Sequence, residues 1–295
     1  MKKPNHQSTA KWMAAAAAAA VCTGAVAADA YPDKPVRMIV GFAPGGGTDV
    51  TARVIVQALS DGLGQRVVID NRPGANGVLG SELAAKAPPD GYTLFMGTPA
   101  HAINTGLYRK LNYDLVRDFA PVSQVSSGQY VVIVHPSLPV KSIKELIALA
   151  RAKPGQLNYA SAGSGNATHL AGELFASKTN TKLVHVPYKG SGPALNDVVG
   201  GQVQLMFCNL TAAMPQVKNG RIRALAVTGA KRAAAAPEIP TVIEAGVRVV
   251  TFDWGGWDTH GQNFVQLKSQ LPRLDRALSA LLQDLSDRDM LKDVR

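Results

Sequence analysis

Two short stretches rich in glycine and small hydroxyl residues have the composition of anion-binding loops. The first reads Ala43-Pro44-Gly45-Gly46-Gly47-Thr48-Asp49, and the second reads SAGSGNATH over residues 161–169. Each follows an apolar run and precedes a helical pattern, so the free amides of a helix N-terminus, aided by the helix dipole, face the loop. Glycine lets the backbone approach a ligand closely. Two such loops in one chain indicate a carboxylate or similar group held by backbone amides from two lobes.

Other interpretations of the loops are weaker. The chain has neither the Gly-Lys-Ser/Thr of a phosphate loop nor a G-x-G-x-x-G dinucleotide fingerprint at these places. For a single glycine run the alternative is a tight turn between a strand and a helix. Thr48 has the hydroxyl of a helix N-cap, which raises the ligand interpretation of the first loop above the turn.

Groups for catalysis are sparse. His101, His135, His169 and His185 are isolated, and none forms an H-x-x-x-H or H-E-x-x-H pair. His135 and His185 lie in apolar runs and are interpreted as structural, whereas for His169, beside a glycine loop, a ligand contact and a structural role are equally open. The serines of the second loop lack a G-x-S-x-G context. The pattern favours binding without catalysis, and no cofactor or metal site is expected.

Short apolar runs alternate with helical patterns, which predicts an α/β fold with parallel-rich sheets. Strands are expected at residues 38–42, 67–70, 93–96, 131–135, 183–186, 203–207 and 224–227. Helices are expected at residues 50–59, 78–87, 142–152, 167–177 and 214–219, with a loop and short helix at 190–199. Ser142 and Glu145, three residues apart, predict a capping box at the start of the third helix. A further loop of small and polar residues is expected at 97–104. Because ligands bind beyond the carboxyl ends of strands in such sheets, the segments 43–49, 97–104 and 161–169 are candidate site loops.

The first 30 residues have the pattern of a cleavable secretory signal. Lys2, Lys3 and Lys11 precede an alanine-dominated apolar stretch at 12–28, and small-x-small cleavage sites lie at its end, at 25–27 and 28–30. The stretch is less apolar than the ~20-residue run that a membrane-spanning helix needs. Cleavage would remove Cys22 and leave Cys208, so neither an internal disulfide nor a cysteine metal cluster is expected.

The charge balance is basic and disfavours nucleic acid as a partner. The formal net charge is +10, and the signal carries three of the lysines and one aspartate. The remaining basic residues are scattered, without the clustered arginines and interleaved aromatics of a nucleic-acid surface. Two interpretations of the charge stay open: a basic exported protein without further meaning, and a surface that attracts anionic small molecules.

Residues 31–246 resemble the Bug-type substrate-binding proteins of tripartite tricarboxylate transporters. The resemblance rests on YPDKPVRMIVGFAPGGGTD, NRPGANGVLG, PPDGYTLFMG, LNYASAGSGNATHLAGELF, VHVPYKGSGPAL, GGQVQLMF and RALAVTGAKR with PEIPTVIEAG. It implies a periplasmic receptor with the two-lobed Venus-flytrap fold, which captures a small carboxylate and hands it to membrane permease subunits. The implied division is lobe one at 31–130, lobe two at 131–230 and a crossover at 231–247.

The resemblance and the loops together give one set of expected ligand-binding residues. They are Ala43, Pro44, Gly45, Gly46, Gly47, Thr48, Asp49, Thr98, His101, Asn104, Ser161, Gly163, Ser164, Thr168, His169, Cys208 and Asn209. Cys208 is a departure, because the family commonly has Met-Phe-Asp-Asn where this chain has Met-Phe-Cys-Asn. A thiol in place of a carboxylate near the cleft would favour a plain organic acid over an amino acid as ligand.

Residues 248–295 do not continue the family pattern. They contain GGWDTH and an amphipathic leucine pattern, and they resemble exported proteins of unknown function in the alkaline-phosphatase and sulfatase clan. Asp258 and His260 match metal-site positions there, but the fragment lacks a nucleophile and most of a metal site. The interpretation is a chimera, in which a foreign strand-helix tail replaces the C-terminal part of lobe one and lowers stability. A metal-dependent phosphatase-like or sulfatase-like hydrolase and a non-functional chimera are the alternatives to the receptor.

Overall fold

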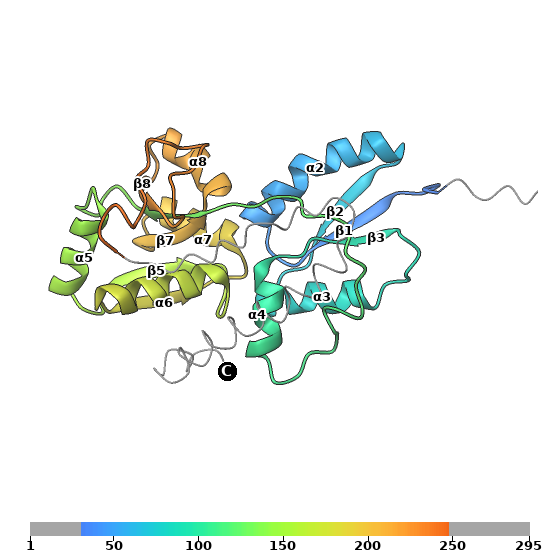
Figure 1. Ribbon diagram of the computed structural model, residues 1–295, viewed down its shortest axis with the longest axis horizontal. Coiled ribbons are helices and arrows are strands. Elements are labelled where there is room, and N and C mark those ends of the chain that lie inside the picture. Colours follow the sequence, from blue (N-terminus) through green and yellow to red (C-terminus); the bar gives the residue numbers. More distant parts are fainter. Residues whose placement is uncertain (1–30, 248–295) are drawn as a thin grey trace, which may run out of the picture.

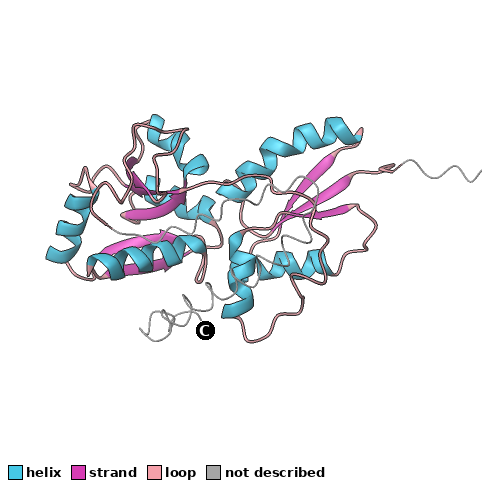
Figure 2. Ribbon diagram, viewed as in Figure 1, coloured by secondary structure: helices cyan, strands magenta, loops and turns pink. Residues whose placement is uncertain are grey.

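Two separate β-sheets divide residues 31–247, the part of the chain that this computed structural model describes, into two lobes. One sheet has three strands in the order β2-β1-β3, and the other has five in the order β6-β5-β7-β4-β8. Figure 1 shows the two lobes side by side, and Figure 2 shows helices flanking the strands of each. This confirms the predicted α/β fold with two lobes and parallel-rich sheets.

Lobe one is built on three parallel strands. Its elements are β1 (Val36–Val40), α2 (Gly47–Leu63), β2 (Val67–Asn71), the 3-10 turn η1 (Ala75–Gly77), α3 (Val78–Ala85), β3 (Thr93–Phe95) and α4 (Pro99–Leu107). Central β1 pairs with both neighbours, with Val36 opposite Val67 and Met38 opposite Leu94. Its apolar side chains pack with Ala52 of α2 to form the core of this lobe.

Lobe two has a mixed sheet. Its elements are β4 (Tyr130–Val134), α5 (Ile143–Ala152), β5 (Leu157–Ser161), α6 (Ala167–Thr179), β6 (Leu183–Pro187), α7 (Ser191–Val199), β7 (Leu205–Asn209), α8 (Leu210–Lys218) and β8 (Arg223–Val227). Strands β5, β6 and β7 run parallel, whereas β4 runs antiparallel to β7 and β8. The run before the second glycine loop is thus a strand, β5, in addition to the seven expected.

The side chains of β7 separate the two cores of lobe two. Leu205 and Phe207 belong to the core that includes α5, whereas Met206 and Cys208 belong to the core that includes α7 and α8. The separation follows from the period of two along a strand, which sends successive side chains to opposite faces. Both faces of this strand are apolar because helices cover both.

One expected loop is a helix. Residues 97–104 were expected to be irregular, but Pro99–Leu107 form α4. Pro99 occupies the first helical turn, where its missing N–H costs nothing, and the N–H of Thr98 donates to Nδ1 of His101 at 2.8 Å. The Thr-Pro-x-His start therefore initiates a helix among residues whose small size suggested a loop.

Two helix starts differ in detail from expectation. Thr48 is not the N-cap of α2, because the helix begins at Gly47 and its N-cap, Gly46, has no side chain. In α5 the hydroxyl of Ser142 accepts from the Glu145 N–H at 3.2 Å as expected, but the Glu145 carboxylate accepts from the Lys141 N–H, one residue earlier than in a capping box. Among residues 31–247, no helix is long and apolar enough to cross a membrane. The expected signal and the atypical tail lie outside the described residues.

Candidate binding site

The first glycine loop meets the start of α7 across the boundary between the lobes. The Ala43 N–H donates to the Lys189 carbonyl at 3.1 Å. Gly192, in the first turn of α7, lies so close to the loop that a Cβ there would come within 2.0 Å of the Pro44 carbonyl oxygen. We call this region, formed by residues 43–49, 75–77, 98–104, 161–169, 188–192 and 209, the interlobe junction.

Several helix N-termini open into the interlobe junction. Helices α2 and α7 meet there, and the side chain of Asn209, at the start of α8, lies beside Gly47. A Cβ on Gly47 would come within 2.6 Å of the Asn209 side-chain oxygen. Helix N-termini carry free amides and partial positive charge, so their convergence makes the junction attractive to an anion.

Asp49 fixes the shape of the first loop. Its buried carboxylate accepts hydrogen bonds from the Gly45 N–H at 3.0 Å, from Arg53 at 2.8 and 3.1 Å, and from the Asn71 amide at 3.0 Å. Burial opposes ionisation of Asp49, but these hydrogen bonds outweigh it and lower the pKa of the carboxyl. Asp49, in the first turn of α2, thus fixes the backbone of the first loop at Gly45.

We expect Asp49→Asn to destabilise the protein by about 1–3 kcal/mol at neutral pH, because Arg53 and the Gly45 N–H lose a charged acceptor. Since the folded pKa is lowered, this contribution is present above the unfolded pKa near 3.8 and is lost as pH falls through the folded value. Urea unfolding at pH 7 measures it. The control is Asp61→Asn on the same helix, where the exposed carboxylate accepts from Gln57. Equal losses in the two variants would contradict the assignment.

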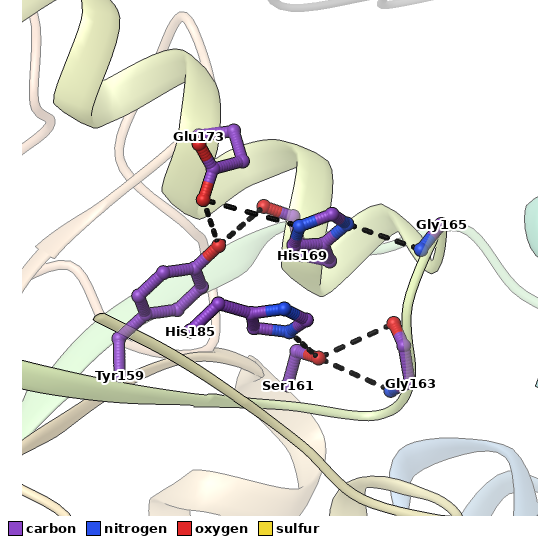
Figure 3. Close-up of polar contacts among 7 residues, drawn as sticks. All are labelled: Tyr159, Ser161, Gly163, Gly165, His169, Glu173 and His185. Carbon is purple, nitrogen blue, oxygen red and sulfur yellow. Dashed lines mark hydrogen bonds and ion pairs between the residues drawn. The ribbon is translucent and has the colours of Figure 1, made fainter. Parts of the chain in front are cut away.

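A network of polar side chains supports the second glycine loop (Figure 3). The Ser161 hydroxyl lies 2.6 Å from Nε2 of His185 and accepts from the Gly163 N–H at 3.1 Å. Nδ1 of His169 accepts from the Gly165 N–H at 3.0 Å. The two imidazole rings stack with their centroids 3.9 Å apart. The predicted residues Ser161, Gly163 and His169 are therefore brought together, with the side chains of the serine and histidine directed at the loop backbone.

Tyr159 and Glu173 extend this network on the side of the histidines away from Gly163 and Gly165 (Figure 3). The tyrosine hydroxyl donates to the Glu173 carboxylate, and its ring stacks on that of His185 with centroids 5.0 Å apart. Burial, followed by the neighbouring His169, lowers the pKa of His185 to about 3, so this imidazole is neutral at physiological pH. A serine hydroxyl bonded to a neutral histidine is the arrangement of a nucleophile and its base. Ser161, however, has no exposed surface through which a substrate could reach it.

His101 lies inside lobe one. Only 1% of its surface is exposed, and its ring packs against Phe42 and Phe95. Burial lowers its pKa to about 4, and Nε2 has no hydrogen-bond partner within the described structure. This nitrogen faces Gly77, where a Cβ would come within 2.7 Å of it. His101 thus forms part of the wall behind the junction.

Cys208 departs from its expected place. It is fully buried in a core of lobe two, where burial raises its pKa to about 12. The reason is strand alternation, because Asn209 is directed at Gly47 of lobe one and the preceding side chain must face the opposite way. The thiol therefore carries no information about a ligand amine.

The remaining expected residues lie on the loops or in the first turns of the helices that follow them. Thr168 is buried, and its hydroxyl accepts from the Ala162 N–H at 2.8 Å. Pro44 and Gly45 are exposed, whereas Thr48, Thr98 and Ser164 are partly exposed. In residues 31–247, no three His, Cys, Asp or Glu side chains are gathered in a way that could hold a metal ion.

Three contributors were missed from the sequence. Asn76 and Asn166 join the lobes through a hydrogen bond of 3.0 Å, and the Gly190-Ser191-Gly192 turn supplies the wall opposite the first loop. The turn has the same signature as the predicted loops, with glycines after an apolar run and before a helix. Asn166 also had a local signal as a helix N-cap, since its side chain accepts from the Thr168 N–H.

Comparison with known proteins identifies the family. Residues 51–257 match the tripartite tricarboxylate transporter family receptor. The chain belongs to this receptor family. Residues 240–294 also match a protein family of unknown function, and their assignment to the alkaline-phosphatase clan stays a prediction.

Individual relatives agree with the family assignment. Protein BugT of Bordetella pertussis is 41% identical over 223 residues, which cover 75% of this chain and 68% of BugT. A structure of the Rhodopseudomonas palustris protein Rpa4515 with adipate has a TM-score of 0.73 and 34% identity, with 90% of this chain and 98% of that chain covered. MatC of the same species, with bound malate, has a TM-score of 0.69 and 32% identity, with 74% of each chain covered.

Within the receptor family the geometry acquires a specific meaning. Two of the similar structures hold the dicarboxylates adipate and malate. The interlobe junction of this chain gathers helix N-termini, whose partial positive charge suits an anion. The first loop is held by Asp49 and the second by His169 and Thr168. These side chains accept hydrogen bonds from the Gly45, Gly165 and Ala162 amides, and so they fix the backbone of both loops at the junction.

Proposed function

We propose that this receptor binds a small organic carboxylate at the interlobe junction and delivers it to the permease subunits of a tripartite tricarboxylate transporter. The observation that carries the proposal is the meeting of α2 and α7 at Gly46 and Gly192, which places two helix N-termini from different lobes at one point. The adipate and malate held by related proteins support a dicarboxylate as the ligand class.

The proposed location is the periplasm. Its support is the pattern of residues 1–30, with basic residues, an apolar stretch and small residues at the cleavage sites. In this proposal the mature receptor diffuses between ligand and permease, and both lobes contribute to the surface that the permease recognises.

Calorimetric titration of the purified mature chain with adipate, malate and citrate tests the proposal. We expect at least one acid to bind, and we expect its uncharged amide to bind at least about 100-fold more weakly, because the junction supplies donors for an anion. Binding of the amide with equal affinity would contradict recognition through helix N-termini. Absence of binding for every acid would contradict the ligand class.

A further inference from the structure

Three asparagine side chains form a buried relay that crosses the boundary between the lobes. In lobe one, Nδ2 of Asn76 donates to Oδ1 of Asn104 at 2.9 Å. From lobe two, Nδ2 of Asn166 donates to Oδ1 of Asn76 at 3.0 Å. All three residues are less than a tenth exposed. The relay thus connects α4 of lobe one with the start of α6 in lobe two.

The direction of each amide is fixed by its neighbours. Oδ1 of Asn166 accepts from the Thr168 N–H at 3.1 Å as the N-cap of α6, so Nδ2 is the atom that faces Asn76. Asn76 must then present its oxygen to Asn166 and its nitrogen to Asn104. Thr168 continues the chain to the second loop, where its hydroxyl accepts from the Ala162 N–H.

Asn76 lies in a segment with an unusual backbone. Four consecutive residues, Gly74 to Gly77, have positive φ angles, and those of Ala75 and Asn76 are 46° and 51°. Side-chain-bearing residues rarely adopt this conformation, although asparagine tolerates it best. The second amide hydrogen bond of Asn104, to the Asn76 carbonyl at 3.0 Å, holds the backbone there.

We propose that Asn76 is a positioning residue that couples closure of the two lobes to the shape of both ligand loops. Asn104 holds Asn76 ready in lobe one, and Asn166 completes the relay only when the lobes are in contact. Opening the lobes exposes the Asn76 oxygen and the Asn166 nitrogen to water, so the hydrogen bond favours the closed form. This inference rests on the proposed function in one respect, namely that the closed form is the one that retains the ligand.

The test compares variants that keep the helix cap but lose the cross-lobe donor. Aspartate and serine cap helices about as well as asparagine, so Asn166→Asp and Asn166→Ser preserve the start of α6. Aspartate has no side-chain donor at neutral pH, and the serine side chain ends one bond short of the position from which the Asn166 amide reaches Asn76. Aspartate also sets a carboxylate oxygen against the Asn76 oxygen. Asn76→Gly is a further variant, because glycine accepts the positive φ while removing the side chain. The control is Asn112→Ser, which removes an exposed hydrogen bond to Glu82 within lobe one.

Small-angle X-ray scattering without ligand measures lobe opening, and titration with adipate and malate measures affinity. We expect a larger radius of gyration for the Asn166 and Asn76 variants, with Asp exceeding Ser at position 166. We expect affinity to fall about five- to tenfold in the serine variant, the change that one hydrogen bond supplies. A purely capping role for Asn166 predicts no effect of aspartate on either readout.

The outcomes separate this inference from the proposed function. Scattering curves of the Asn166 variants that match the wild type and Asn112→Ser would overturn the coupling role, whatever ligand binds. If the wild type binds no carboxylate while the variants still expand, the proposed ligand class fails and the relay stands. Thermal unfolding of each variant verifies that it is folded.

Discussion

Replacement of Gly192 by alanine is expected to weaken carboxylate binding by about 100-fold or more, the equivalent of roughly 3 kcal/mol. A Cβ at this position would lie 2.0 Å from the Pro44 carbonyl oxygen and 3.1 Å from two further backbone atoms of the first loop. Backbone atoms cannot yield as a flexible side chain does, so the lobes must separate to admit the methyl group. Titration with the acid that binds the wild type measures the loss.

The stability of each lobe should change little in Gly192→Ala, because the clash lies between the lobes. Gly200, at the C-terminal end of the same helix, provides the control, since the nearest atom to a Cβ there is 3.4 Å away. We expect Gly200→Ala to bind like the wild type. Wild-type affinity in Gly192→Ala would show that the contact between Pro44 and Gly192 is not part of the ligand-bound form.

Acidification from pH 6.5 to pH 4 is expected to remove about 3 kcal/mol of folding stability through His101 alone. Burial lowers the folded pKa of His101 to about 4, whereas an unfolded histidine titrates near 6.5. Between these values the unfolded chain binds the proton and the folded chain does not. The stabilisation is therefore complete above the unfolded pKa and is lost as pH falls toward the folded value.

Urea unfolding over this pH range, on wild type and His101→Asn, measures the effect. Asparagine does not titrate, and its side-chain oxygen can occupy the position that Nδ1 of His101 has in the wild type. There it accepts the hydrogen bond from the Thr98 N–H. We expect the variant to be less stable at pH 7 and to show a flatter pH dependence. His185, with a pKa of about 3, contributes to the same window and remains in the variant. Identical slopes in the two proteins would contradict the role of His101.

The alternation of elements could be predicted because it depends on local patterns. Apolar runs such as those of β1 and β7 predict buried strands, and the spacing of Ser142 and Glu145 predicts the start of α5. Helix α4 was predicted as a loop because its residues are small and polar. Its initiation depends on Pro99 and on a histidine that accepts a backbone hydrogen bond, which composition alone does not indicate.

The site could be predicted only as two halves. Each glycine loop has a signature in the sequence, but which atoms meet across the lobes is decided by tertiary contact. Two residues illustrate this. Asn76 meets Asn166, which lies 90 residues further along the chain, and Gly192 meets Pro44 of the other lobe. Cys208 was misplaced for a related reason. Alternation along β7 sends Cys208 and Asn209 to opposite faces, and only the tertiary contact of Asn209 with Gly47 shows which face meets the junction.

The buried position of Cys208 also determines how this receptor withstands oxidants. A thiol whose pKa burial raises to about 12 has almost no thiolate at neutral pH, and the thiolate is the species that reacts. Packed between helices α7 and α8 and the sheet, the sulfur meets solvent only when this core opens. The rate of its chemical modification is therefore governed by the unfolding equilibrium of lobe two, and lobe movements that open the junction leave it protected.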